Sequence, residues 1–573
     1  MALFEITNQE EDSEMNATAR FRRGLIVFAL VGTALASAPK QASALNITLG
    51  SGTTRYSVVN VSSSPATVVA TYYYSNGNPG PQQSFTLNPN ARLIVDVSTV
   101  SGLPGGWSGS VVLSSDQDIA AVAVTQYSGR PNYEAAGGPP RADGDAGTEA
   151  SAYDAFNTGS TTLYAPLIQR VPRTRSPSFA AIASRITIQN TTANVASGVV
   201  NVNLEGTPLT PIPFTLQPYG SITFDTANDT DPIVTAGLTG NLGERRASLV
   251  VTATQPIAGV VEQNWDNPAT SQNWSGGYAM LIPSEAGNTL FSAQAQRECR
   301  VATPCIMPNA SDSFSAGNDQ RRFNTYSSFT LLNIGSATAN VQAVFIPAQG
   351  SPGTYYTQNI TLNFTIPPQA LFDINLLNGG TITSGNPLFN TLFQPLVNKN
   401  FRGSLQVTSD QPLVGIGFFQ QPQGDSQNYV STYNLVSPSG ATNRVVIPWV
   451  DRDCALTTPC PAPAPGVTVA DYNSFSNIVV VNVGSAPATI NSVTFYTQTG
   501  VSQLVLSPFT LPPGASYSIN TRGGGNEPFA TMQLLSEKFY GSVVITASAG
   551  SQIKAVVSVA NSRVSDIYNA MNR

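Results

Sequence analysis

Four cysteines and 33 acidic residues are the main groups in this 573-residue chain that could do chemistry, because it contains no histidine. Without histidine, the Ser–His–Asp and Cys–His arrangements that activate a nucleophile cannot be built. Glycoside hydrolysis needs two facing carboxylates, but the acids show no paired pattern and are scattered, as at Glu205, Glu244, Glu262, Glu285, Asp373 and Asp410. No phosphate-binding loop or Gly-x-Ser-x-Gly elbow occurs. The sequence therefore predicts a protein that is not an enzyme and uses no cofactor.

All four cysteines fall in two matching segments, QRECRVATPC and DRDCALTTPC. Their shared C-x5-C spacing predicts two local disulfides, Cys299–Cys305 and Cys454–Cys460, and hence an oxidising compartment. A zinc site is the alternative chemistry for four thiols. It is disfavoured because the two pairs lie about 155 residues apart and no histidine can complete the ligand set.

Two acidic loops offer the oxygen ligands that calcium prefers. One loop carries Asp143 and Asp145, and the other carries Asp225, Asp229 and Asp231. Neither has the D-x-D-x-D-G order of a calcium-binding loop. We expect solvated loops, with structural calcium as the alternative.

Aromatic side chains are the candidates for ligand binding, since flat rings can stack on sugars. The candidate glycan contacts are Tyr72, Tyr74, Trp265 and Trp274. The two-residue period of a strand puts Tyr73 on the face opposite Tyr72 and Tyr74, so one side of this run is expected in a core. Trp449 is expected to pack between neighbouring domains.

The elements that must position these residues repeat four times. A hairpin pattern recurs, aligned on Ser110, Ser248, Ser404 and Ser542. Its turn carries Asp116 and Asp410 where the second copy has Thr254, which indicates a turn-forming role for the acid. Upstream, an apolar strand ends in each copy at an asparagine that can bond the turn backbone: Asn60, Asn190, Asn333 and Asn482. A Phe-Thr-x-x-Pro segment follows, and its proline is expected in a turn. The period predicts tandem β-domains.

The segments NVGSAPAT (482–489) and LPPGAS (511–516) resemble the CARDB-like and other immunoglobulin-like repeats of secreted bacterial cell-surface, S-layer-like proteins. The resemblance covers most of the chain after residue 45, although the first two copies lack a glycine after the asparagine. It implies an all-β fold of four tandem immunoglobulin-like antiparallel β-sandwiches, used extracellularly for architecture, adhesion or display.

The expected domains are repeat 1 at 45–128, repeat 2 at 161–280, repeat 3 at 281–443 and repeat 4 at 444–573. A flexible linker is expected at 129–160, because its centre is rich in Gly, Pro and Ala. Regular connections between the repeats predict an elongated, semi-rigid array. The stretch SRVSDIYNAMNR at the end of the sequence fits either a short helix or a strand.

Residues 1–44 have the pattern of a signal peptide. Arg20, Arg22 and Arg23 precede an apolar stretch, and Ala42–Ala44 form an Ala-x-Ala cleavage site. The mature chain is expected to begin at Leu45, and Met15 is an alternative start of translation. An uncleaved anchor is the competing interpretation, but the stretch is shorter than the roughly 20 residues that span a bilayer.

The low content of charged residues limits the kinds of partner that the chain can bind. Only 10% of residues are charged and the net charge is −6, which gives no basic surface for nucleic acid or anionic membranes. We therefore expect a secreted, non-enzymatic structural protein of the cell surface. It would associate with itself or with other surface proteins to form a coat, sheath or filament, with no membrane span after cleavage. An adhesin or carbohydrate-binding array is the alternative, and an enzyme accessory or hydrolase is the third class.

Overall fold

The computed structural model describes residues 4–8, 24–30, 51–128, 149–156, 159–171, 181–240, 245–267, 272–299, 305, 307–308, 323–348, 354–423, 427–454, 472–523, 525–526, 529–561 and 565–572. Antiparallel strands dominate these ranges, so the all-β prediction is confirmed. The helices are α1 (Pro232–Thr235), α2 (Pro387–Phe393) and α3 (Phe529–Met532), with 3-10 turns at Val97–Thr99, Pro283–Glu285 and Gln394–Leu396. No helix in the described ranges has the length and apolar character needed to cross a membrane.

The strands form four sheet systems, which we call modules 1 to 4. Module 1 contains β1 (Phe4–Asn8), β2 (Gly24–Leu30), β3 (Ser51–Asn60), β4 (Ala66–Tyr74), β5 (Pro79–Leu87), β6 (Arg92–Asp96), β7 (Gly109–Ser115), β8 (Ile119–Ser128) and β9 (Glu149–Phe156). Module 2 contains β10 (Ser160–Val171), β11 (Ala181–Asn190), β12 (Ala196–Leu204), β13 (Thr207–Pro208), β14 (Ile212–Leu216), β15 (Ser221–Asp225), β16 (Arg246–Asn267) and β17 (Gln272–Ala279).

Module 3 contains β18 (Gly287–Cys299), β19 (Phe323–Asn333), β20 (Ala339–Pro347), β21 (Ile360–Ile366), β22 (Leu371–Asn375), β23 (Gly379–Gly380), β24 (Phe401–Gln423) and β25 (Gln427–Asn434). Module 4 contains β26 (Arg444–Cys454), β27 (Tyr472–Asn482), β28 (Ala488–Thr497), β29 (Ser502–Leu506), β30 (Phe509–Leu511), β31 (Ser516–Asn520), β32 (Lys538–Ala547), β33 (Ile553–Asn561), β34 (Ser565–Asn569) and β35 (Met571–Asn572).

One long strand or hairpin joins two sheet halves in each module. In module 2, the first part of β16 pairs with β12 and β10, and its second part pairs with β11 and β17. Alternating side chains of both halves meet in one buried cluster, which includes Val200 and Leu249 from one half and Ile188 and Val261 from the other. The result is a sandwich-type core. The narrower immunoglobulin-like class stays a prediction.

Strand β2 lies inside the segment expected to be a leader. Ile26 pairs with Leu113 of β7, at the register where Leu163, Leu290 and Val445 of β10, β18 and β26 pair in the other modules. Gly24–Leu30 thus takes the place of the first strand of a module in this structure. The signal peptide itself stays a prediction.

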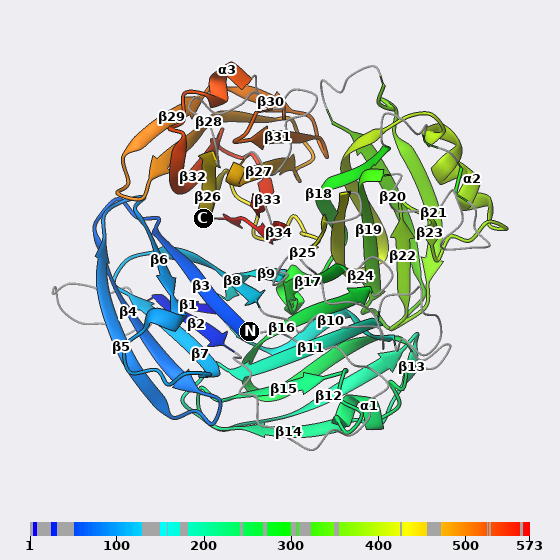
Figure 1. Cartoon of the computed structure of the whole chain (residues 1–573). Coiled ribbons are helices and arrows are strands. Elements are labelled where there is room, and N and C mark those ends of the chain that lie inside the picture. The colour runs from blue at the N-terminus through cyan, green and yellow to red at the C-terminus, as the bar shows by residue number, and fades with distance from the viewer. Residues whose placement is uncertain are drawn as a thin grey trace, which may run out of the picture.

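The four modules close into a ring (Figure 1). Module 4 contacts module 1 directly, through side chains of β3, β6 and β26. The elongated array that we expected is therefore wrong. The repeats that suggested a rod also contain the contacts that join each module to the next, so that the chain turns back on itself.

The innermost strands β9, β17, β25 and β34 pack against one another around the centre of the ring (Figure 1). Small residues allow this close approach. A Cβ added to Gly276 would clash with Thr432 Oγ1, and one added to Gly277 would lie 2.7 Å from Ser151 Oγ. Larger residues at either position would force the strands apart.

Two local expectations change with this arrangement. Strand β9 lies within 129–160, so part of the expected linker is an ordered central strand. The last residues form β34 and β35, which selects a strand over a helix for this stretch. Both segments pack at the centre of the ring, and single-sequence periodicity does not show that location.

Candidate functional site

The repeated asparagines are buried turn residues. Asn482 Nδ2 donates to the carbonyls of Ala486 (2.8 Å) and Leu511 (2.9 Å), and its Oδ1 accepts from the Gly484 N–H (3.0 Å). Equivalent bonds are made by Asn60, Asn190 and Asn333. The structural role predicted for these residues is confirmed, because each amide satisfies the backbone of a turn.

The hairpin acids also have a structural role. Asp116 Oδ1 accepts from the Thr67 N–H (2.7 Å), and Asp410 Oδ1 accepts from the Asn340 N–H (2.8 Å). Thr254 Oγ1 makes the same bond with the Ser197 N–H (3.0 Å). The turn-forming interpretation is therefore confirmed.

The boundary between consecutive modules, here called a seam, uses the same repeated motifs. Ser110 Oγ donates to the Tyr219 carbonyl across seam 1–2, and Ser404 Oγ donates to the Gly514 carbonyl across seam 3–4. Ser542 Oγ donates to the Asn90 carbonyl across seam 4–1. Each acceptor lies in the Pro turn with a left-handed φ. At seam 2–3, Ser248 Oγ has no partner within the described residues, and an Arg246–Asp373 ion pair joins the modules.

Seam 4–1 joins the first and last modules without a peptide linker. The buried Arg92 guanidinium donates to the carbonyl oxygens of Gly541 (2.5 Å) and Val450 (3.3 Å) and pairs with the Asp451 carboxylate (3.3 Å). It also lies 5.5 Å from the centre of the Trp449 ring. This cluster stabilises ring closure.

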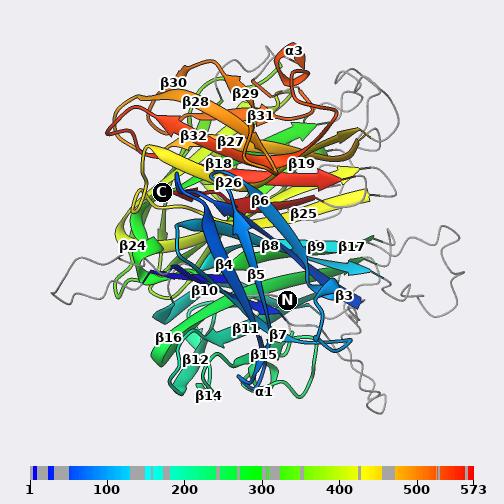
Figure 2. The ribbon, with the colours of Figure 1, turned by 90° about the vertical axis from the view of Figure 1, so that its left-hand side faces the viewer.

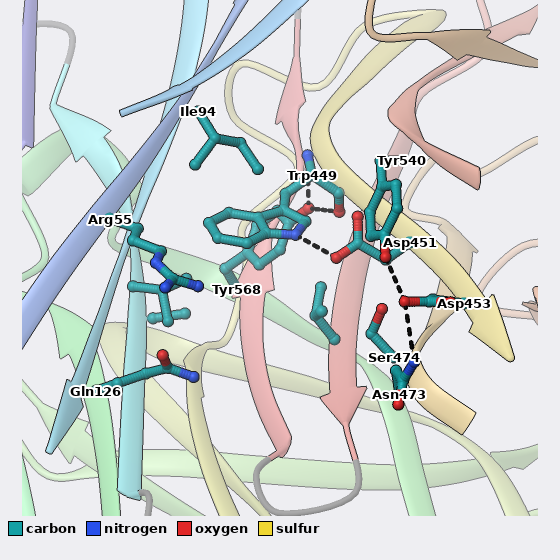
Figure 3. A pocket seen from close by; sticks show the side chains of 13 residues that line it. Arg55, Ile94, Gln126, Trp449, Asp451, Asp453, Asn473, Ser474, Tyr540 and Tyr568 are labelled. Atoms are coloured by element: carbon teal, nitrogen blue, oxygen red, sulfur yellow. Dashed lines mark hydrogen bonds between the residues drawn. The ribbon is translucent and has the colours of Figure 1, made fainter. Parts of the chain in front are cut away.

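A cavity of about 320 Å³, which we call the seam pocket, opens between these two modules (Figure 3). Module 1 supplies residues of β3, β6, β8 and β9, and module 4 supplies residues of β26, β27, β32, β33 and β34. The lining residues are Arg55, Ile94, Val124, Gln126, Ala152, Trp449, Asp451, Asp453, Asn473, Ser474, Tyr540, Val559 and Tyr568.

Strand β26 forms the acidic side of the seam pocket. Its two-residue period puts Trp449, Asp451 and Asp453 in the same lining. Trp449 Nε1 donates to Asp451 Oδ2 (2.8 Å), which fixes the indole, and Tyr568 OH donates to the main-chain carbonyl of Trp449 (Figure 3). Asp451 is engaged on both oxygens, by Trp449 and by Arg92.

Asp453 is bonded on only one of its two oxygens. Its Oδ2 accepts from Tyr540 OH and from Asn473 Nδ2 (3.2 Å). The residue is only 7% exposed, and its Oδ1 is buried. Even so, Oδ1 has no hydrogen-bond partner among the described residues. Such a carboxylate is suited to accepting a donor from a ligand.

Burial dominates the electrostatics of the seam pocket. It raises the pKa of the Asp451 carboxyl, although Arg92 and the Trp449 N–H act in the opposite direction. Burial, the hydrogen bond to Asp453 and its negative charge all raise the pKa of Tyr540. The lining therefore combines fixed hydrogen-bond acceptors with an apolar wall.

The cysteine prediction is confirmed where the structure describes it. Cys299 and Cys305 form a disulfide, and Cys454 is also disulfide-bonded. Cys460 lies outside the described residues, and the described cysteines include no free thiol. The thiols of Cys299, Cys305 and Cys454 are therefore engaged in disulfides, and the disfavoured zinc alternative does not apply to them.

The predicted glycan contacts do not form an exposed platform. Tyr72 is fully buried and bonds Tyr56 and Gln83, and Trp265 is 8% exposed and packs edge-on against Phe418. Tyr74 is half-buried against Trp107. The side chain of Trp274 lies outside the described residues. Packing between sheets and modules explains these rings better than sugar stacking.

The calcium candidates have other partners. Asp231 Oδ1 caps α1 and its Oδ2 accepts from the Asp225 N–H (2.7 Å), while Asp229 pairs with Arg170. Among the described residues, no group of three acidic or thiol side chains is placed to hold a metal. Asp143 and Asp145 lie outside the described residues.

Sequence reasoning missed the seam pocket, because its two walls come from opposite ends of the chain. Only Trp449 was singled out, as a packing residue between domains, and the structure does place it at a seam. The signal available was the Trp-x-Asp-x-Asp spacing of 449–453 on one predicted strand, which puts a ring and two acids on one face.

No family model and no curated protein match this sequence. Solved structures that align with it include the crystal structure of Thermotoga maritima 1070, at 13% identity and a TM-score of 0.16, covering 26% of this chain and 90% of that chain. Another is Salmonella alpha-2-macroglobulin reacted with methylamine, at 9% identity and a TM-score of 0.09, covering 98% of this chain and 38% of that chain. At these TM-scores neither likeness carries an inference. The resemblance to secreted surface repeats is supported only as an all-β, multi-sheet structure.

Proposed function

We propose that the chain is a secreted, non-enzymatic structural protein of the bacterial cell surface, which self-assembles through the strands at its rim into a coat, sheath or filament. The disulfide is compatible with an extracellular location. Partners would be further copies of the chain or other surface proteins. Of the aromatic contacts proposed for the adhesin alternative, Tyr72 and Trp265 are buried and Tyr74 is half-buried.

The observation that carries the proposal is the lack of charge on the outer edge strands. Strands β5, β21 and β29 end their sheets, and β14 pairs only with β12. Figure 2 shows β4 and β5 on the outer side of module 1. These edge strands read PGPQQSFTL, ITLNFTI, SQLVL and IPFTL, without Lys, Arg, Asp or Glu. Charges normally protect such edges against pairing between molecules.

Module 4 has the most apolar of these edges. Val505 on β29 is 56% exposed and Val501, just before it, is 61% exposed. Large apolar side chains on an unpaired edge favour strand addition by another chain. We therefore expect β29 to be a principal assembly contact.

Light scattering and negative-stain electron microscopy over a concentration series test this proposal. The wild type should form ordered assemblies, and the Val501→Lys/Val505→Lys variant should remain monomeric because charge blocks the edge. Val195→Lys is the matched control, since Val195 is 48% exposed but lies in the turn between β11 and β12. A wild type that stays monomeric at every concentration would overturn the proposal.

A further inference from the structure

We infer that the seam pocket binds a small organic ligand through its ammonium group. This inference goes beyond self-assembly, because the pocket lies between modules 1 and 4 and the proposed assembly contacts lie on the rim. The volume of about 320 Å³ falls at the lower end of ordinary ligand pockets. A molecule of amino-acid or monosaccharide size suits it.

The charges around the seam pocket do not balance. Arg55 pairs with Asp96 (3.0 Å), and Asp451 pairs with Arg92 (3.3 Å). Asp453 has no basic partner among the described residues, and only Tyr540 and Asn473 donate to it. Buried carboxylates are ordinarily paired with a cation, because desolvating an isolated charge is costly. The missing group is a cationic donor.

Module 3 shows what the same position looks like when the pair is complete. Aligned on Ser404 and Ser542, Glu298 corresponds to Asp453, and Arg402 corresponds to Tyr540. Arg402 Nε and Nη2 donate to Glu298 Oε1 at 2.9 and 2.6 Å. Module 4 therefore keeps the carboxylate and replaces its arginine by a tyrosine. An external ammonium would restore the pair.

The rest of the lining suits the body of such a ligand. Trp449, Ile94, Val124 and Val559 offer an apolar wall, and the indole face also attracts cations. Arg55 stands at the mouth with its side chain 49% exposed and its guanidinium turned toward the pocket (Figure 3). Rotation about the Asp453 Cβ–Cγ bond swaps the positions of the two carboxylate oxygens. Either oxygen can therefore accept from Tyr540 while the other accepts from the ligand.

Calorimetric titration of the full chain with matched probes tests the inference. Glucosamine should bind where glucose does not, because the two differ in the ammonium group. L-leucine, a zwitterionic amino acid, and putrescine, a dicationic diamine, then show which class of ammonium compound the seam pocket prefers. Asp453→Asn should weaken the glucosamine Kd at least tenfold, about 1.4 kcal/mol. Asp410→Asn, an exposed acid outside the seam pocket, should leave Kd unchanged.

A second variant keeps the test decisive if Asp453→Asn proves unstable. Tyr540→Arg reproduces the pair that module 3 already contains, so it should fold and should abolish ammonium binding by occupying Asp453. Glucose binding as tightly as glucosamine, or Tyr540→Arg binding as the wild type does, would refute the inference. Assembly measured on the same samples is an independent readout, so that failure of one proposal does not imply failure of the other.

Discussion

At the scale of single residues, the repeated asparagines make the largest local contribution to the turns. Each is fully buried and bonds one carbonyl and one N–H of its own turn, together with a carbonyl of the segment that leads into the Pro turn. In module 4, removing the amide leaves the buried Leu511 carbonyl and two partly buried backbone groups without this partner, and a fully buried unpaired group costs about 1–3 kcal/mol. Sequence alone identified these residues, because the asparagine recurs at the same place in all four copies.

We expect Asn482→Ala to destabilise module 4 by about 2–4 kcal/mol. Native-state hydrogen exchange on amides of β27 and β28 would measure the loss within that module. Asn491→Ala is the control, because Asn491 is exposed and, within the described residues, its side chain accepts one hydrogen bond, from Ser548 Oγ. Equal effects of the two substitutions would contradict the role assigned to the turn.

Buried carboxyls near the centre of the ring make stability depend on pH. Burial, followed by the charge of Glu285, raises the pKa of Asp154 well above its ordinary value, while Lys554 and the Asn569 N–H act in the opposite direction. A raised pKa means that the folded protein binds the proton more tightly than the unfolded chain. Its stabilising contribution is complete below the unfolded pKa near 4 and is lost as pH rises through the folded pKa.

The unfolding temperature should therefore be higher at pH 5 than at pH 8. Asp154→Asn should reduce this difference, because the amide cannot lose a proton. Asp410→Asn should leave the difference unchanged, since the pKa of Asp410 is lowered and it stays ionised throughout this range. Scanning calorimetry at both pH values gives the comparison, and an unchanged difference in Asp154→Asn would count against this account.

At the scale of elements, the hairpin serine and the Pro turn are complementary halves of one seam. The serine lies on the hairpin of one module and its acceptor lies on the Pro turn of the next. Both motifs were visible in the sequence, the serine as a repeated position of the hairpin and the proline as a turn residue. Their partners were not, because single-sequence patterns report on neighbours in the chain and the seam bonds join residues about 100 or more positions apart.

Two equivalent serines of the repeat, Ser542 with a seam bond and Ser248 without one among the described residues, allow a matched test of that bond. Ser542→Ala should destabilise seam 4–1 by about 1 kcal/mol, since it removes the hydrogen bond from the buried Ser542 hydroxyl to the partly buried Asn90 carbonyl. Ser248→Ala should be nearly neutral, because Ser248 Oγ has no partner within the described residues. Hydrogen exchange at the two Pro turns would report the difference, and comparable losses at both seams would refute it.

Buried arginines form another repeated element that the sequence did not reveal. Arg170, Arg297 and Arg452 each lie near the end of the first strand of a module and donate to main-chain carbonyls, as Arg452 does to Leu535 (2.6 Å). A charged residue in a strand is ordinarily expected to face solvent. Only the tertiary position of the carbonyls explains why these side chains are buried.

At the scale of the whole molecule, closure of the ring makes the chain compact and so sets its radius of gyration. A compact chain of this length has a radius of gyration of about 25 Å. The strand composition and the number of repeats could be predicted from the sequence. The ring could not, because the rotation from one module to the next depends on seam contacts between distant residues.

Small-angle scattering should give a radius of gyration of about 25 Å for the wild type. Arg92→Ala should increase it by opening seam 4–1, because it leaves Asp451 buried without its cation, at a cost of about 3–5 kcal/mol. Arg55→Ala is the control, since Arg55 forms a half-exposed pair with Asp96. An unchanged radius in Arg92→Ala would show that the ion pair is not needed for closure.

The head-to-tail character of the seams also bears on the ancestry of the chain. Each module carries the serine half of the contact on one side and the acceptor half on the other. Four separate copies of one such module would therefore close head to tail into a symmetric homotetramer. Such an ancestor would have had four identical clefts at its subunit boundaries. Fusion of such copies into one polypeptide would free each boundary to diverge, and in this chain Arg92, Asp451 and Trp449 meet at the boundary between modules 4 and 1.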